Sequence, residues 1–171
     1  MLDAVEALGF VPDARVFALN SYENRVYQVG LEDGRYLVVK FYRPQRWTTE
    51  QILEEHGFAR ELVEHDIPVI APLEIRGATL HAINDFQVAV FPRCSGRPPE
   101  LDNLDNLLVM GRFVARIHAV GALRPFAHRH RLSLQRFAID SREYLLAEGF
   151  LPPDLRPAYE TLSRDLVIAM E

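Results

Sequence analysis

Hydrophobic and polar positions alternate with a period of two through much of the first half of the chain. Three such runs come first, ARVFAL, NRVYQVGL and RYLVVKFY, with Glu32-Asp33-Gly34 as a hairpin turn between the last two. Two more, TLHAI and FQVAVF, follow on either side of Asn84-Asp85. This alternation predicts an antiparallel sheet.

Helical spacing interrupts the strands once and then replaces them. Residues 48–65 place apolar side chains three and four apart, and Thr48 or Thr49 is available as the N-cap. After Pro98-Pro99 the same spacing runs through Leu104, Leu107, Leu108, Gly111, Val114, Ala115 and His118. Further helices are predicted over 133–147 and 154–170. The fold class is therefore α+β: a sheet with one long helix, then helices.

Composition narrows the class of protein. The chain has 171 residues, of which 49% are hydrophobic, enough for one domain or for one small domain and part of a second. A formal charge of −5 argues against a general nucleic-acid binder. Cys94 is the single cysteine, the start MLDAVEALGF lacks the features of a signal peptide, and no apolar run approaches the roughly 20 residues of a membrane span. We expect a cytoplasmic protein that binds no membrane.

Lys40 is the first candidate for chemistry. Strand alternation puts Lys40 on one face with Tyr36 and Val38, and the apolar Leu37, Val39 and Phe41 on the other. An isolated strand lysine commonly extends its amine to water. A partly buried lysine instead needs a carboxylate partner, because an unpaired ammonium is costly to desolvate.

The predicted helix at 48–65 offers two carboxylates, Glu54 and Glu55. Adjacent helical residues point about 100° apart, so only one of them faces the sheet. Glu55 shares the spacing of Ile52, Ala59 and Leu62, which favours it as the partner of Lys40. Glu54 becomes the alternative if the start of the helix shifts.

The loop NSYENR, residues 20–25, contains no glycine although it joins two strands shortly before Lys40. Turns in this position wrap nucleotide phosphates with backbone N–H groups in kinases. Asn20 and Asn24 tolerate left-handed backbone angles, and Ser21 adds a small hydroxyl donor. An ordinary polar β-turn is the alternative interpretation.

In this order, the strings LNSYENRVYQV, VVKFYRPQRW, QILEEHGFARELVEHDIPV, VAVFPRCSGR and MGRFVARIHAVG resemble the stress-response kinase A family. This bacterial group has the aminoglycoside phosphotransferase and choline kinase fold. The resemblance covers nearly the whole chain. It implies an ATP-dependent kinase that phosphorylates serine or threonine of proteins, with a protein-kinase-like N-lobe followed by the first helices of a helical C-lobe.

The resemblance assigns roles to the residues that line the first lobe. The phosphate-covering loop would comprise Asn20, Ser21, Tyr22, Glu23 and Asn24. Val26 would cover the adenine and Val38 would lie beneath it. Lys40 would contact the α and β phosphates, with Glu55 orienting it. The inter-lobe hinge would present Phe91, Arg93 and Cys94 to the adenine edge, since Pro92 has no N–H.

The resemblance also implies boundaries, with a nucleotide-binding N-lobe at 1–94, a linker at 95–100 and a partial C-lobe at 101–171. Members of this fold carry an HGDxHxxN-like catalytic loop and a later metal-binding aspartate. The sequence contains neither, so no catalytic or metal-binding residue is predicted in these 171 residues. We expect the ATP-binding half of a kinase, either cut from a longer chain or naturally short. Mg²⁺ is expected only for the complete enzyme.

Two other functions stay open: a non-catalytic pseudokinase scaffold, and a lobe of a choline- or aminoglycoside-type small-molecule kinase. The six histidines form no ligand set with metal-site spacing. His118 is expected on the inner face of its helix. The run RPFAHRHRLSLQR, residues 124–136, is interpreted as a solvated basic face.

Overall fold

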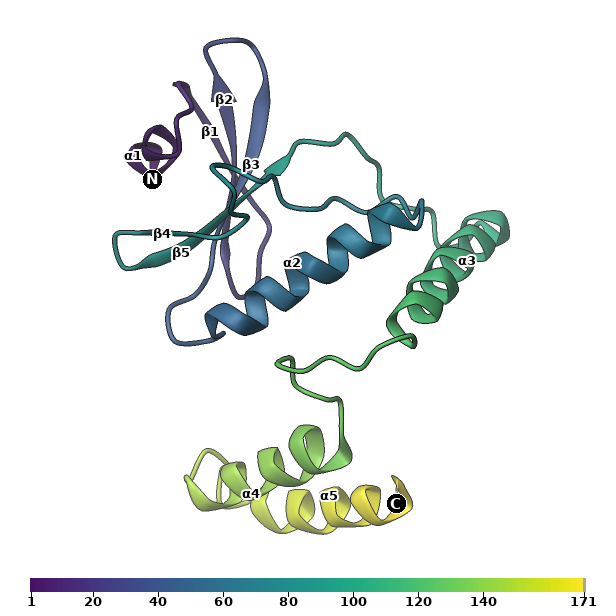
Figure 1. Cartoon of the computed structure of the whole chain (residues 1–171). Coiled ribbons are helices and arrows are strands. Elements are labelled where there is room, and N and C mark those ends of the chain that lie inside the picture. Colours follow the sequence, from purple (N-terminus) through teal and green to yellow (C-terminus); the bar gives the residue numbers. More distant parts are fainter. Residues whose placement is uncertain (171) are drawn as a thin grey trace. The chain divides into compact units, whose positions relative to one another are not determined.

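One antiparallel sheet of five strands, in the order β1-β2-β3-β5-β4, organises the first part of the chain (Figure 1). The structure is a computed structural model that describes residues 1–170. The strands are β1 (Pro12–Leu19), β2 (Arg25–Leu31), β3 (Tyr36–Phe41), β4 (His81–Ile83) and β5 (Phe86–Pro92). The helices are α1 (Leu2–Ala7), α2 (Thr49–Glu64), α3 (Leu104–Gly121), α4 (Asp140–Ala147) and α5 (Arg156–Met170), with a π-helical turn η1 (Gln135–Ile139) before α4. The predicted strands and the long helix between them are confirmed.

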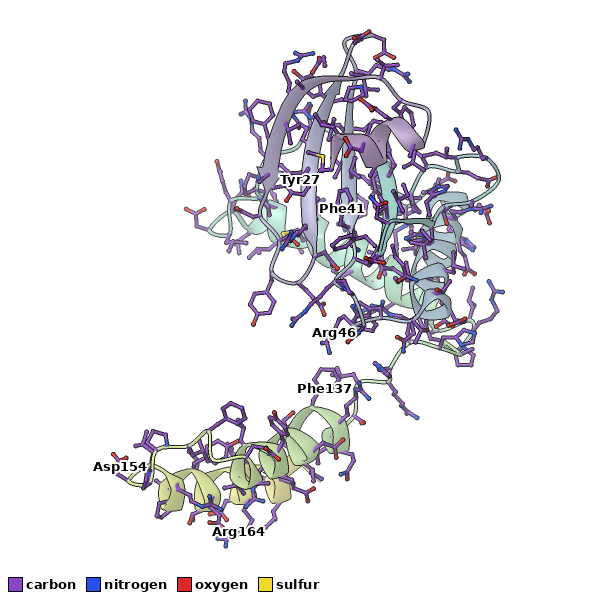
Figure 2. All side chains as sticks on the ribbon, turned by 90° about the vertical axis from the view of Figure 1, so that its left-hand side faces the viewer. Tyr27, Phe41, Arg46, Phe137, Asp154 and Arg164 are labelled. Carbon is purple, nitrogen blue, oxygen red and sulfur yellow. The ribbon has the colours of Figure 1, made fainter. Side chains whose placement is uncertain are left out.

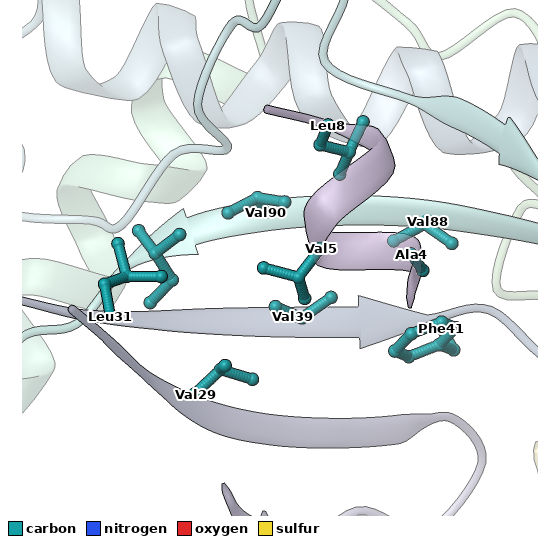
Figure 3. Close-up of a cluster of buried hydrophobic side chains, with 10 residues drawn as sticks. Ala4, Val5, Leu8, Val29, Leu31, Val39, Phe41, Val88 and Val90 are labelled. Carbon is teal, nitrogen blue, oxygen red and sulfur yellow. The ribbon is translucent and has the colours of Figure 1, made fainter. Parts of the chain in front are cut away.

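The main core lies on one face of the sheet, under α1. Strand alternation buries Leu37, Val39 and Phe41 of β3, while Tyr36, Val38 and Lys40 are only partly buried. Figure 3 shows Val5 of α1 against this surface. The rings of Tyr27 and Phe41 extend the core edge to face, with centroids 6.1 Å apart (Figure 2).

Helix α1 is an element that the periodicity did not predict. Its six residues include buried Ala4 and Val5, and Leu8 just after it is also buried. Its N-cap, Met1, makes no side-chain capping hydrogen bond. A segment this short forms too little helix by itself, so packing on the sheet stabilises it.

Helix α2 covers the opposite face of the sheet. Its N-cap is Thr48, whose hydroxyl accepts the Gln51 backbone N–H at 3.3 Å, while the Gln51 side chain accepts the Thr48 N–H at 3.0 Å. Ile52 is fully buried against Tyr42 and Ala89. The capping box and this contact fix the start and the rotation of α2.

Helix α3 contacts α2 near its C-terminal end, where Ile117 and Val120 pack with Leu62 and Ile67. Much of its apolar stripe is exposed, including Leu104, Leu107, Leu108 and Val114. His118 is exposed as well. The prediction that His118 faces inward is therefore wrong, because the inward stripe of α3 runs through Ile117 and Val120 instead.

Within the described residues, 1–129 and 130–170 form two compact units. In the second, Arg142 of α4 donates to the Ser163 hydroxyl at 2.9 Å and to the Glu160 carbonyl at 3.1 Å, which ties α4 to α5. The predicted helices at 133–147 and 154–170 are found there, the first with the π-helical turn at its start. This division lies after residue 129 and not at the linker expected at 95–100. It does not test the predicted lobes at 1–94 and 101–171, which stay a prediction.

Among the helices within residues 1–170, we find none with the combined length and hydrophobicity required to cross a bilayer.

Candidate functional site

Four of the predicted site residues lie on one face of the sheet. Directly paired residues of antiparallel strands point to the same side. Val26 of β2 pairs with Lys40 of β3, and Val38 of β3 pairs with Phe91 of β5. Lys40 and Val38 are two residues apart and therefore share that side. The register thus assembles two valines, an aromatic ring and an ammonium on the face opposite the main core.

The structure pairs Lys40 with Glu55. Lys40 Nζ lies 3.1 Å from Glu55 Oε1, and the two side chains are 20% and 36% exposed. Glu54 instead binds backbone N–H groups of the segment after α3. Lys40 is also the only lysine in the sequence. The amine is accessible enough to meet an anion, yet an acid already holds it in place.

A hydrogen-bonded group that the sequence did not predict lies beside this pair. Lys40 Nζ is 4.3 Å from the centre of the Tyr42 ring. The Tyr42 hydroxyl lies 2.8 Å from His56 Nε2, and His56 Nδ1 lies 2.9 Å from the Thr79 hydroxyl. All three side chains are buried. Tyr42 lies two residues after Lys40, so continuing the alternation of β3 by one residue would have placed Tyr42 on the same face as Lys40.

Burial sets the protonation of this group. It raises the pKa of the Tyr42 hydroxyl, and the nearby Glu55 charge raises it further. Burial lowers the pKa of His56 to about 4, against the attraction of Glu55. Both side chains are therefore neutral at pH 7. Because the hydroxyls of Tyr42 and Thr79 can each donate or accept, both ring nitrogens of a neutral His56 have a hydrogen-bond partner in either tautomer.

The loop before β2 is held by its side chains. Glu23 pairs with Arg46, and Asn24 Oδ1 accepts the Arg43 backbone N–H at 3.2 Å. Asn20, Ser21 and Tyr22 are exposed. Neither asparagine adopts a positive φ, so the left-handed angles that they tolerate are not used. The loop is thus fastened to residues 43–46, just after the strand that carries Lys40.

The predicted hinge follows β5. Phe91 is half-buried and meets the His56 ring edge to face, with centroids 6.2 Å apart. Arg93 donates to the Gln28 amide oxygen at 3.3 Å and to the Ser95 hydroxyl at 2.6 Å. Cys94 is exposed and unbridged. The segment therefore leaves the sheet beside Val38, which pairs with Gln28 of β2 on one side and with Phe91 of β5 on the other.

Arg129 is the residue at this site that the sequence analysis missed. Its Nη1 lies 2.9 Å from Glu55 Oε2, and its guanidinium lies 4.1 Å from the centre of the Trp47 ring. The interpretation of 124–136 as a solvated basic face is wrong for Arg129, whose side chain is only 28% exposed, whereas Arg124 pairs with Glu61 of α2 and is still 75% exposed. Arg129 and Glu55 are 74 residues apart, so no local pattern indicates their contact.

An apolar sheet face beside a held ammonium suits a ligand that joins a flat ring to an anion. Val26, Val38 and Phe91 offer surface to the ring, and Lys40 offers charge to the anion. Within residues 1–170, no group of three or more histidine, cysteine, aspartate or glutamate side chains is arranged to hold a metal ion.

Comparison with known proteins finds two named relatives of this chain. The chain is 42% identical over 170 residues to stress response kinase A of Escherichia coli (strain K12), and 41% identical to serine/threonine protein kinase RdoA of Salmonella typhimurium. Each alignment covers 99% of this chain and 52% of the relative, so the chain spans about half the length of the relatives it matches.

Solved structures share the fold. The amicoumacin kinase hAmiN in complex with AMP-PNP, Ca²⁺ and Ami superposes with a TM-score of 0.70 at 22% identity, over 96% of this chain and 52% of that one. The microcompartment-associated aminopropanol kinase gives 0.66 at 19% identity, over 88% and 51%. The model of the phosphotransferase enzyme family matches residues 13–168. With the resemblance to stress response kinases, this match shows that the chain belongs to the phosphotransferase enzyme family.

Proposed function

We propose that this chain is the ATP-binding portion of a cytoplasmic kinase of the stress-response type, which phosphorylates serine or threonine of proteins. The observation that carries the proposal is the Lys40–Glu55 ion pair beside Val26 and Val38. In kinases an acid-held lysine positions the nucleotide phosphates. The name of one relative, serine/threonine protein kinase RdoA, supports the phosphoacceptor class.

The proposed roles follow the geometry. Lys40 contacts the α and β phosphates, and Glu55 orients its amine. The loop 20–24 covers the phosphates with its backbone, while Val26 and Val38 enclose the adenine. Backbone groups of Phe91, Arg93 and Cys94 bind the adenine edge. In the complete enzyme Mg²⁺ would neutralise the phosphate charge.

These 171 residues are proposed to bind nucleotide without turnover. They contain no HGDxHxxN-like loop, hence no residue matching the base that accepts the hydroxyl proton. A second candidate is a small-molecule kinase lobe, which the names of the two structural neighbours favour. Phosphotransfer by a chain extended to the length of these relatives, assayed on proteins and on amino alcohols, separates the two substrate classes.

Replacing Lys40 with alanine is expected to weaken ATP binding about tenfold, because a charge-assisted contact to phosphate is lost. Isothermal titration of the 171-residue chain with ATP and with adenosine measures the effect. Adenosine affinity is expected to change little, since it has no phosphates for Lys40 to meet.

Arg35→Ala is the matched control. It removes the same charge from an exposed pair with Asp33 in the turn before β3. ATP affinity is expected to stay within about twofold of wild type. No ATP binding by the wild-type chain, or equal binding by Lys40→Ala, would contradict the nucleotide proposal. Measurable phosphotransfer by this chain alone would contradict the absence of turnover.

A further inference from the structure

The two carboxylate oxygens of Glu55 bind two different cations. Oε1 lies 3.1 Å from Lys40 Nζ, and Oε2 lies 2.9 Å from Arg129 Nη1. The Arg129 side chain is 28% exposed, and Arg129 belongs to the segment that follows α3. Glu55 therefore stands between the strand lysine and a residue far along the sequence.

Side chains of α2 hold the backbone around Arg129 in place. The Glu54 carboxylate accepts the N–H groups of Ala127, His128 and Arg129, the last two at 2.9 and 2.6 Å. The Gln51 side chain donates to the His128 carbonyl at 2.9 Å. Burial raises the pKa of Glu54, but these backbone donors outweigh it and the pKa lies below its ordinary value. An ionised Glu54 thus clamps residues 127–129 onto α2.

The side chain of Arg129 is restrained as well. Its guanidinium lies over the Trp47 ring, at 4.1 Å from the ring centre, while Nη1 meets Glu55. A guanidinium is planar, so it can stack on an aromatic ring while its N–H groups donate in a fixed direction, whereas the ammonium of lysine has no such plane. The arginine is consequently fixed in both position and orientation when it meets Glu55.

We propose that Arg129 is a positioning residue for Lys40, which acts through Glu55. This inference rests on the proposed function only for its consequence on nucleotide binding. A carboxylate with one partner can rotate and exchange its oxygens, whereas a second cation on Oε2 leaves Oε1 as the acceptor for Lys40. The segment after α3 thereby determines how the phosphate-binding lysine is presented.

The same segment contains a built-in control. Arg124 pairs with Glu61 of α2 at 2.8 Å, so it also joins the segment to the helix. Its side chain is 75% exposed, and its partner lies six positions beyond Glu55. If both arginines only attached the segment to α2, replacing either one would change the reactivity of Lys40 equally. The proposal instead expects a change only when Arg129 is replaced.

The first test measures Lys40 without nucleotide. Because Lys40 is the only lysine, acylation of its amine by an N-hydroxysuccinimide ester can be followed by mass spectrometry, apart from the α-amino group. Arg129→Gln is expected to raise the acylation rate of Lys40 about threefold or more, since Glu55 is then free to leave it. Arg124→Gln is expected to match wild type, and Arg129→Lys to fall between. If Arg129→Gln is not folded, Arg129→Lys against Arg124→Lys makes the same comparison.

The second test is a double-mutant cycle on ATP affinity. Arg129→Gln is expected to weaken ATP binding about threefold in the wild-type chain and to have little effect when Lys40 is already alanine. Equal acylation of the Arg129 and Arg124 variants, or fully additive losses in the cycle, would overturn the inference. If the wild-type chain binds no ATP, the proposed function fails, and the acylation rates alone decide the role of Arg129.

Discussion

Replacing Ile52 with alanine is expected to lower the free energy of unfolding by about 2 to 4 kcal/mol, the usual range for an isoleucine truncated in a tight core. Ile52 is 0% exposed and packs against Tyr42 and Ala89, which join α2 to the sheet. It also lies one helical turn before Glu55. Urea unfolding followed by the fluorescence of Trp47, the only tryptophan, measures the loss.

Leu53→Ala is the control for this prediction. Leu53 is the next residue of α2 and is 44% exposed, so its truncation removes less buried surface. Its cost is expected to stay below about 1 kcal/mol. Equal losses for the two variants would mean that α2 is not attached to the sheet through Ile52, and the geometry given for Glu55 would lose its support.

The sheet, α2 and the Lys40–Glu55 pair were predictable because each rests on a local periodicity. Period-two alternation placed Lys40 opposite the Val39 face, and helical spacing placed Glu55 with Ile52. Pairing of β3 with its neighbours then brought Val26 and Phe91 to the same side. Their functional roles came from the resemblance to kinases and still await the nucleotide experiments.

What the sequence did not predict depends on contacts between distant residues. Helix α1 is too short to be specified by its own six residues and exists because the sheet covers it. The Arg129–Glu55 pair joins residues 74 apart. Asn24 was singled out because asparagine tolerates left-handed backbone angles, but it does not adopt one and accepts the Arg43 N–H instead. In each case the partner, and not the local pattern, decides the outcome.

The buried His56 is expected to make the protein less stable as the pH falls from about 6.5 to 4. Its pKa is about 4 in the folded chain and 6.5 ordinarily, so between these values the unfolded chain binds a proton that the folded chain does not. Stability is therefore fully present above pH 6.5 and is lost on acidification. Each pKa unit corresponds to about 1.4 kcal/mol, which predicts a loss of about 2 to 3 kcal/mol between pH 7 and 4.5.

Two variants isolate this contribution. His56→Gln keeps a donor and an acceptor between Tyr42 and Thr79. Its stability at pH 7 is expected to fall. Because glutamine does not titrate, the dependence of its stability on pH is expected to flatten. His118→Gln, which removes an exposed histidine from α3, is the control for the loss of a histidine. Urea unfolding at several pH values supplies all three curves. A wild-type profile no steeper than that of His56→Gln would show that His56 takes up its proton in the folded chain, which burial beside Tyr42 should prevent.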